Sequence, residues 1–219
     1  MNTPSNKSVI NKPSFIVLCG GEGSGKSTIV NAIKEAYPSV AVTREPGGSL
    51  YGEDIRELMF GNPGGAKANA ETMFGLFWAA RADHLFHKVG PALKAGMSVV
   101  SDRFDCCTFA YQIYGQEARQ LEQLFWTMRT HYLKECRPNL YIFLDVKVEE
   151  GLKRVTGRHD KKNHFDERDM AFHERIRQGY LDFIEKIVKA GEHVAIVDAN
   201  KSLADVRGEV LDIIGKLVS

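Results

Sequence analysis

The chain has 219 residues, of which 43% are hydrophobic and 26% are charged, and these values suit one globular α/β domain with a substantial core. The net charge of +1 argues against a basic surface that holds a nucleic-acid backbone. Because the four cysteines (Cys19, Cys106, Cys107 and Cys136) lack zinc-ligand spacing and no apolar run reaches membrane-span length, we expect reduced thiols in a cytoplasmic protein with no membrane partner.

The apolar pattern predicts one folded domain over 14–219, after a disordered tail at 1–13. Short apolar runs predict strands at 14–19, 39–43, 97–102, 140–145 and 193–199. Helical patterns follow them at roughly 26–36, 53–60, 69–88, 105–112, 117–134, 147–155, 167–190 and 202–217. Near-continuous apolar runs that alternate with helices indicate a five-stranded parallel sheet covered by helices on both faces.

The turn after the first predicted strand reads CGGEGSGKST. Gly20, Gly25, Lys26 and Ser27 fit the phosphate-loop pattern G-x-x-x-x-G-K-[ST] between a strand and a helix. In such a loop backbone N–H groups converge on phosphate oxygens, the lysine reaches the β- and γ-phosphates, and the serine can ligate Mg²⁺. The residues expected to hold ATP or GTP are Gly20, Gly21, Glu22, Gly23, Ser24, Gly25, Lys26, Ser27 and Thr28. The loop alone leaves the reaction open.

Three later segments carry charged and aromatic side chains at the ends of strands or on helix faces. TREPGGS (43–49) places Arg44 and Glu45 before a rigid Pro-Gly-Gly turn, and Arg56 follows on the next helix. MFGLFWAARADH (73–84) places Phe77 and Arg81 on one helix face. The third segment, SDRFDCCTFAYQ (101–112), supplies Asp102, Arg103, Thr108, Tyr111 and Gln112.

The segment 153–169 is unlike its neighbours, because it mixes six lysines and arginines with four acids. Apart from Val155 and Phe165 it has little to bury. We therefore expect a solvated flap, or lid, rather than a part of the core.

Together, GGEGSGKST, TREPGGS, LFWAARADH, DRFDCCTFAYQ, LYIFLDV and IVDA make the chain resemble the thymidylate kinase family. The resemblance covers nearly all of the chain after residue 13, and the pair TREPGG and DRF…AYQ is highly specific. It implies a P-loop nucleoside monophosphate kinase fold, phosphorylation of dTMP to dTDP with ATP and Mg²⁺, and a homodimer formed through helix packing. The apolar helices expected around 69–88 and 117–134 permit such a dimer.

The acceptor-site roles that follow from this resemblance suit the chemistry of a nucleotide. Phe77 can stack on a pyrimidine, Arg81 can donate to a base carbonyl, and Thr108 and Gln112 can read the remaining base edge. Arg56 and Arg103 are expected to hold the acceptor phosphate. The rest of the expected acceptor site is Arg44 and Glu45 in the same pocket, Tyr111 under the deoxyribose, and Glu22 near the 3′-hydroxyl.

The expected catalytic groups are cations, because a phosphate acceptor needs no general base and catalysis reduces to alignment and charge stabilisation. The expected catalytic set is Lys26, Asp102, Arg103, Arg154 and Arg158, with Ser27 and Asp102 at the metal. Related kinases carry a catalytic arginine either in the phosphate loop or in the lid. The loop here has none, so we expect Arg158 to reach the transferring group from the lid, with Arg154 in support and Lys161 and Lys162 nearby.

Three positions depart from the family pattern: Cys19 replaces a common acid, His164 replaces a common arginine, and Cys107 replaces a common serine. The departures suggest a divergent member of the family, such as one from a virus or a mobile element. Phe74 and Trp78 are expected in the core, His84 and His87 as surface or packing residues, and the cysteines as inert space-filling groups.

Two other functions remain open at this point. A deoxynucleoside kinase also has a phosphate loop and a lid, but its hydroxyl acceptor needs a carboxylate base such as Glu45 or Asp102. A non-catalytic nucleotide switch or a nucleic-acid motor would be expected to carry a partner-binding module or a basic surface.

Overall fold

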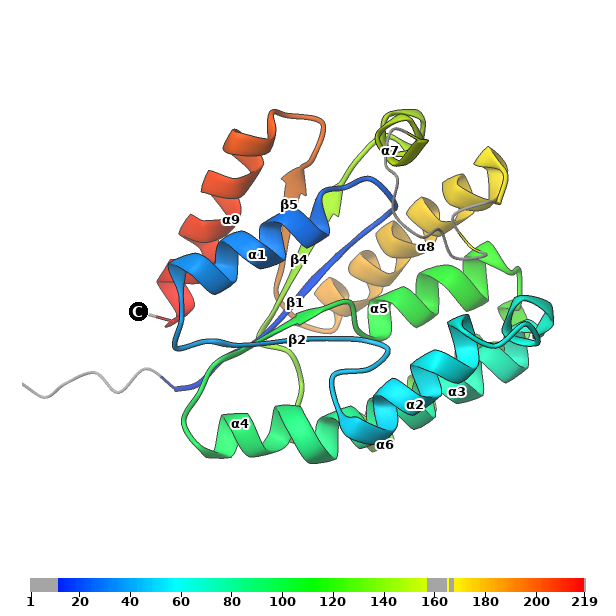
Figure 1. Ribbon diagram of the computed structural model, residues 1–219, viewed down its shortest axis with the longest axis horizontal. Helices are drawn as coiled ribbons and strands as arrows, with labels where there is room; N and C mark the ends of the chain where they lie inside the picture. Colours follow the sequence, from blue (N-terminus) through cyan, green and yellow to red (C-terminus); the bar gives the residue numbers. More distant parts are fainter. Residues whose placement is uncertain (1–11, 157–164, 166–167, 219) are drawn as a thin grey trace, which may run out of the picture.

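A parallel sheet of five strands lies at the centre of the molecule (Figure 1). The computed structural model describes residues 12–156, 165 and 168–218. The strands are β1 (Phe15–Gly20), β2 (Ala41–Arg44), β3 (Val99–Asp102), β4 (Leu140–Asp145) and β5 (Val194–Asp198). Their order is β2-β3-β1-β4-β5, and Ile16 on β1 is in register with Val100 on β3 and Leu140 on β4. The predicted α/β class and parallel sheet are confirmed.

Helices follow every strand. The α-helices are α1 (Lys26–Ala36), α2 (Leu50–Phe60), α3 (Ala70–His84), α4 (Gly90–Lys94), α5 (Asp105–Thr108), α6 (Glu122–Leu133), α7 (Val148–Thr156), α8 (Met170–Lys189) and α9 (Leu203–Val218). Two short 3₁₀ turns, η1 (Gly65–Lys67) and η4 (Arg119–Leu121), and two π-helical segments, η2 (Leu85–Val89) and η3 (Phe109–Gly115), complete the described elements. The helices expected at 69–88 and 105–112 therefore change from α to π geometry part-way along.

The sheet is buried on both faces, because alternate side chains of β1 enter two different clusters. Phe15 and Val17 join the larger cluster, which includes residues of α3, η3 and α8. Ile16 and Leu18 join a second cluster with residues of α1 and α9. Figure 1 shows α1 and α9 together on one side of the strands, with α2, α3 and α6 on the other. Phe74 and Trp78 lie in the larger cluster, as predicted.

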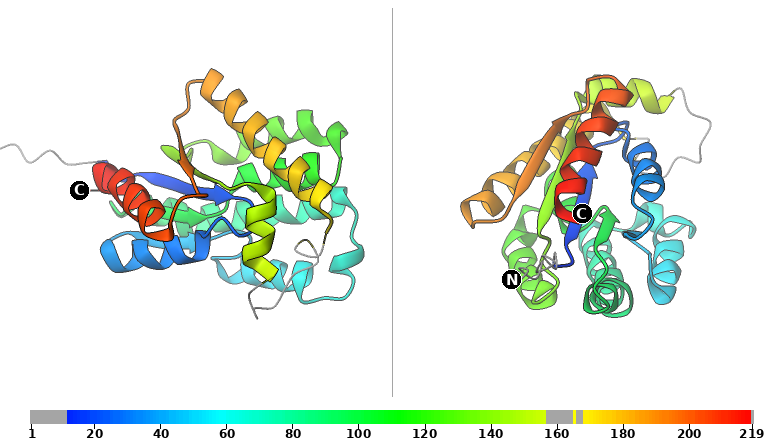
Figure 2. Two further views of the ribbon diagram at one scale, coloured as in Figure 1. Left: turned by 90° about the horizontal axis from the view of Figure 1, so that it is seen from above. Right: turned by 90° about the vertical axis from the view of Figure 1, so that its left-hand side faces the viewer.

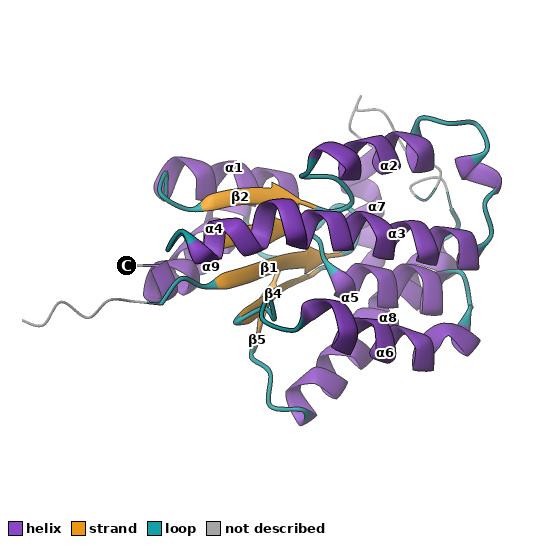
Figure 3. Cartoon of the chain, turned by 90° about the horizontal axis from the view of Figure 1, so that it is seen from below, coloured by secondary structure: helices purple, strands orange, loops and turns teal. Residues whose placement is uncertain are grey.

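The helices α2, α3, α5 and α8 extend past the carboxyl ends of the strands (Figure 3). In open parallel sheets ligands bind at this edge, where the strand order reverses around the first strand. The two views of Figure 2 show α7 beside the loop between β1 and α1. Within residues 12–156, 165 and 168–218, no helix combines the length and the apolar character needed to cross a membrane.

Candidate active site

The loop from Gly20 to Gly25 joins β1 to α1 and packs against the first turn of α7. Gly23 has φ +69°, and a Cβ built there would lie 2.1 Å from the carbonyl oxygen of Gly151 on α7. A Cβ on Gly151 would in turn lie 2.3 Å from the carbonyl oxygen of Glu22. Two glycines thus let the loop and α7 touch backbone to backbone.

Lys26 begins α1 and turns back over the loop. Its Nζ donates to the carbonyl oxygens of Gly20 (3.0 Å) and Gly21 (2.7 Å) and to Ser24 Oγ (3.2 Å). Burial and the nearby Arg103 guanidinium lower the pKa of Lys26, although Glu22 and Asp102 act in the opposite direction. The ammonium is therefore held at the centre of the loop, where a phosphate group of a bound nucleotide would lie.

A cavity of about 280 Å³ opens beside Lys26, and we call it the loop cavity. Its lining residues are Glu22, Gly23, Gly25, Lys26, Ser27, Arg44, Glu45, Arg56, Asp102 and Arg103. Among the described residues, Asp102 Oδ1 is a buried oxygen with no hydrogen-bond partner. Ser27 is exposed at the start of α1, as is Thr28, so its hydroxyl is accessible from this cavity. A free carboxylate oxygen and a hydroxyl are the oxygen ligands or water partners that Mg²⁺ prefers.

Arg103 turns into the site from the end of β3 in a left-handed conformation, with φ +69°. Such a conformation is strained for a non-glycine residue, at a cost of about 1–3 kcal/mol, and concentrates at functional sites. The Arg103 Nη2 donates to Glu22 Oε1 at 3.0 Å, and the Tyr111 hydroxyl donates to the same oxygen at 2.7 Å. The acid inside the phosphate loop therefore faces a cation and a phenol from the opposite side of the site.

The ionisation of Glu22 is set by this environment. Burial opposes the charge, but Arg103, Lys26 and the hydrogen bond from Tyr111 outweigh it and lower the pKa of Glu22 to about 2. Burial and the adjacent Glu22 raise the pKa of Tyr111 well above its usual value. Glu22 is consequently a carboxylate, and Tyr111 a neutral donor, at neutral pH.

A second cavity, of about 600 Å³, lies between α2, α3 and η3, and we call it the aromatic cavity. Its lining residues are Glu22, Glu45, Pro46, Arg56, Glu57, Phe60, Gly61, Phe77, Arg81, Arg103, Phe104, Cys107, Tyr111 and Phe165. Five of these are aromatic, and the volume falls in the range of small-molecule sites. The cavity therefore offers a flat, largely apolar ligand several ring surfaces.

Arg81 is a charged residue of the aromatic cavity wall and is completely buried. Its Nε donates to Glu45 Oε2 at 2.9 Å and its Nη2 donates to Thr108 Oγ1 at 3.0 Å. The guanidinium lies over the rings of Trp78, at 4.5 Å, and Phe104, at 5.1 Å. Among the described residues, Arg81 Nη1 has no hydrogen-bond partner. The Nη1 amino group, which carries two N–H donors, thus remains for a ligand in this cavity.

Four residues line both cavities: Glu22, Glu45, Arg56 and Arg103. Arg56 Nη1 donates to the carbonyl oxygen of Pro46 at 3.0 Å. Burial and the nearby Arg44 lower the pKa of Arg56, with Glu53 and Asp102 acting in the opposite direction. Two arginines therefore stand where a ligand of the aromatic cavity would meet a ligand of the loop cavity.

Arg44 was expected in the acceptor pocket and is placed at its outer side. Its side chain is half exposed, pairs with Glu53 at 2.8 Å, and lines the loop cavity. Thr108 and Gln112 were expected to read a base edge. Both are fully buried, and neither lines the aromatic cavity as the described residues form it. Thr108 Oγ1 instead accepts a hydrogen bond from Arg81, and Gln112 Nε2 donates to Gln116.

The lid is described only in part. Arg154, on α7, donates to the carbonyl oxygens of Ala199 (2.9 Å) and Gly23 (3.4 Å), so it lies against the phosphate loop. Arg158, Lys161, Lys162 and His164 lie outside the described residues. The segment 153–169 was expected to be a solvated flap with little to bury apart from Val155 and Phe165, and Phe165, at 4% exposed, does join the larger core cluster.

Phe165 belongs to the aromatic cavity. Its ring stacks on Phe172 at 6.0 Å and meets Tyr111 edge-on at 5.6 Å. The charged neighbours in sequence hid this role, although a lone aromatic residue among charges was the available signal. Cys107 also lines the cavity, and its Sγ accepts a hydrogen bond from the Tyr180 hydroxyl at 3.1 Å.

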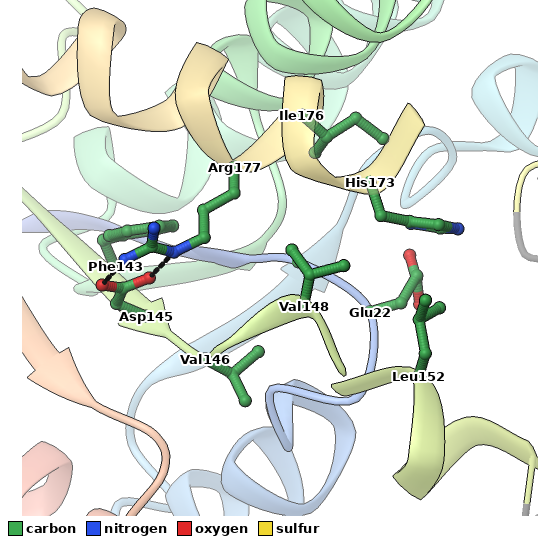
Figure 4. Close-up of a pocket in the computed structure, with 10 residues that line it drawn as sticks. Glu22, Phe143, Asp145, Val146, Val148, Leu152, His173, Ile176 and Arg177 are labelled. Carbon is green, nitrogen blue, oxygen red and sulfur yellow. Dashed lines mark hydrogen bonds and ion pairs between the residues drawn. The ribbon is translucent and has the colours of Figure 1, made fainter. Parts of the chain in front are cut away.

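The back of the phosphate loop is closed by α7 and α8 around a small pocket of about 20 Å³ (Figure 4). Arg177 on α8 forms a two-pronged ion pair with Asp145 at the end of β4, with both N···O distances 2.8 Å. Figure 4 shows Glu22 and His173 at the other end of the pocket. The pocket has room for about one water molecule, so the nucleotide-sized spaces are the two cavities in front of the loop.

His84 was expected as a surface or packing residue, and it is a packing residue whose polar contacts the sequence did not predict. The residue is completely buried, with Nδ1 2.9 Å from Glu45 Oε1 and Nε2 2.8 Å from Thr43 Oγ1. Its position three residues after Arg81, on the same helix face, was the signal that could have revealed it.

Comparisons with known proteins agree with this geometry. A family model described as thymidylate kinase matches residues 19–210. A thymidylate kinase of Marinomonas sp. (strain MWYL1) is 37% identical over 210 residues, which cover 93% of this chain and 94% of that protein. A thymidylate kinase of Ectopseudomonas mendocina (strain ymp) is 37% identical over 205 residues, covering 90% and 92%. The crystal structure of thymidylate kinase from Ehrlichia chaffeensis is 26% identical, with a TM-score of 0.69, and the match covers 93% of this chain and 98% of that one.

Proposed function

The chain belongs to the thymidylate kinase family, and on this premise we propose that it transfers the γ-phosphoryl group of ATP to the phosphate of dTMP, forming dTDP. The observation that carries the proposal is the meeting of two cavities at Arg56 and Arg103. A donor phosphate chain in the loop cavity and an acceptor phosphate at the end of the aromatic cavity would meet between these cations.

The aromatic cavity suits the acceptor. Phe77 lines it on the α3 side and offers a ring for stacking on a pyrimidine, and the free Arg81 Nη1 offers a donor for a base carbonyl. The arginine forks of Arg56 and Arg103 suit two oxygens of a phosphate dianion. A phosphate monoester has a second pKa near 6, so the acceptor is already a nucleophile at neutral pH and needs no general base.

The loop cavity suits the donor. Backbone N–H groups of the loop and Lys26 would hold the β- and γ-phosphates, as in other P-loop enzymes. Ser27 and Asp102 are the residues that would hold Mg²⁺, directly or through water, and the orphaned Asp102 Oδ1 supports this assignment. When bound, the ion supplies positive charge that offsets repulsion between donor and acceptor phosphates.

The lid would supply the remaining cation. The loop contains no arginine, and Arg154 on α7 already contacts the carbonyl oxygen of Gly23. We assign Arg158, four positions after Arg154 in the sequence, to the transferring phosphoryl group, with Arg154 in support.

A deoxynucleoside kinase fits the contacts less well. Its carboxylate base would have to be free to take a proton from the nucleoside hydroxyl. Both oxygens of Glu45 are engaged, one by Arg81 and one by His84, and the free Oδ1 of Asp102 is the oxygen assigned to Mg²⁺. Two arginines at the acceptor end are also more than a neutral hydroxyl needs.

The experiment is a panel of thymidine and the nucleoside monophosphates, each with ATP and Mg²⁺, in a coupled assay for ADP. We expect ADP formation that depends on dTMP and not on DNA. Product from thymidine with none from dTMP would reverse the assignment in favour of a deoxynucleoside kinase, and ADP formation without an acceptor would favour a nucleotide switch.

We also propose a homodimer in the cytoplasm. Exposed apolar side chains on α2 and η2 support the dimer, among them Leu50 (88% exposed), Tyr51 (65%) and Phe86 (75%). All four cysteines are free thiols, as in proteins of a reducing compartment. Light scattering after size exclusion tests the dimer, and a mass of 24.5 kDa in solution would contradict it.

A further inference from the structure

A buried chain of polar side chains runs behind the aromatic cavity, from Thr43 through His84 and Glu45 to Arg81. The successive contacts are 2.8 Å from Thr43 Oγ1 to His84 Nε2, 2.9 Å from His84 Nδ1 to Glu45 Oε1, and 2.9 Å from Glu45 Oε2 to Arg81 Nε. The four side chains belong to residues no more than 8% exposed. The contacts of a buried polar network restrict its members to one arrangement.

The contacts on both ring nitrogens fix the orientation of the His84 imidazole. An ionised carboxylate only accepts hydrogen bonds, so His84 donates from Nδ1 to Glu45. On the other side of the ring, Nε2 is held by the contact with the Thr43 hydroxyl. Gly48 closes the other side, because a Cβ built there would lie 2.9 Å from His84 Nε2 and 2.4 Å from Thr43 Oγ1. The imidazole therefore has little room to turn.

Arg81 depends on this support. Glu45 and Thr108 take its Nε and Nη2, and Nη1 is the donor left without a partner among the described residues. Without His84, the Glu45 oxygen Oε1 would lose its partner inside the protein and the carboxylate would be free to rotate. The direction of Arg81 Nη1 would then no longer be fixed.

We propose that His84 is a positioning residue for base recognition, which holds Glu45 so that Arg81 Nη1 points at the 4-carbonyl of the acceptor base. The proposal rests on the proposed phosphorylation of dTMP. A pyrimidine with an amino group at position 4 presents donors to Arg81 instead of an acceptor, and sites that require a hydrogen bond reject analogues that cannot form it. The His84–Glu45 contact thus sets the preference for dTMP over dCMP.

The test compares three variants of His84 by steady-state kinetics with dTMP and dCMP. In H84N the amide nitrogen stands at the level of Nδ1 and can still donate to Glu45, whereas in H84Q it stands at the level of Nε2, toward Thr43. The third variant, H84A, removes both contacts. The control is H87A. His87 lies three residues further along the chain, is exposed, and lines neither cavity.

We expect H84A to lower the ratio of kcat/KM for dTMP over dCMP about tenfold, as loss of an aligned hydrogen bond from a charged donor would. The change should come mainly from a higher KM for dTMP, with kcat little affected, because Arg81 does not contact the transferring group. H84N should retain most of the preference and H84Q should not, while H87A should equal the wild type. Melting temperatures measured in parallel identify a variant that has lost its fold.

A folded H84A protein with the wild-type preference would overturn the inference. If H84A does not fold, equal preferences in H84N and H84Q overturn it. A wild type that fails to phosphorylate dTMP overturns the proposed function instead. In that case calorimetric Kd values for dTMP and dCMP, measured on the same variants, decide the role of His84 separately.

Discussion

Replacement of Glu22 by glutamine is the sharpest test of the charge arrangement in the phosphate loop. The glutamine keeps the shape of the side chain but cannot ionise. The pKa of Glu22 falls from 4.5 to about 2 in the folded protein, and the carboxyl side chain is only 17% exposed. The shift corresponds to about 3 kcal/mol of folding free energy at pH 7.

The sign of the pH dependence follows from the direction of the shift. Because the folded pKa is depressed, the contribution is fully present above the unfolded value of 4.5 and is lost as the pH falls toward about 2. At pH 3 the contribution should have fallen to about 1 kcal/mol. The free energy of unfolding of Glu22→Gln should therefore be about 3 kcal/mol below wild type at pH 7, and about 1 kcal/mol below it at pH 3.

Urea denaturation at a series of pH values, followed by the fluorescence of Trp78 and Trp126, measures this difference. With an m-value of about 2 kcal/mol/M, the midpoints at pH 7 should lie about 1.5 M apart. A gap that stays constant from pH 7 to pH 3 would refute the reasoning, because it would mean that the charge of Glu22 does not contribute to folding.

Three further predictions concern the donor site, the lid and the aromatic cavity. Lys26→Ala should lower kcat at least about a hundredfold, as loss of a preorganised electrostatic contact does, and calorimetry should find the Kd of dTMP unchanged. Arg158→Ala should lower kcat about a thousandfold with the KM of dTMP nearly unaltered, and an unaltered kcat would remove Arg158 from the mechanism. Phe165→Ala should cost about 3 kcal/mol in urea denaturation, because a buried ring is lost, and should raise the KM of dTMP; Phe165→Leu, which keeps apolar volume, should lose less on both measures.

The sheet and the phosphate loop were predictable because their signals are local. A continuous apolar run such as Phe15–Cys19 reads as a buried strand whatever it packs against. The spacing of Gly25, Lys26 and Ser27 likewise identifies a phosphate loop from a few adjacent residues. The change from α to π geometry at Phe109 was not predictable, because apolar periodicity over one or two turns does not separate the two helix types.

The contacts within the site were harder to predict from the sequence, because they join distant parts of the chain. Glu22 is 81 positions from Arg103 and 89 positions from Tyr111. The residue types suggested a shared site, but not that one carboxylate oxygen accepts from both. The contact of His84 with Glu45 was missed for the same reason, since the two residues are 39 positions apart. The place of Phe165 in the aromatic cavity was missed because its sequence neighbours are charged and indicated a solvated flap.

The contact between Gly23 and Gly151 links the fates of two positions that are far apart in the sequence. A methyl group on Gly23 would overlap the backbone of Gly151, and a methyl group on Gly151 would overlap the carbonyl group of Glu22, next to Gly23. A library that randomises the codon of Gly23 alone, or that of Gly151 alone, should therefore return glycine at the randomised position. A larger residue at either position requires α7 to move away from the phosphate loop. The distance between the nucleotide site and the helix that leads into the lid therefore limits which residues can evolve at positions 23 and 151.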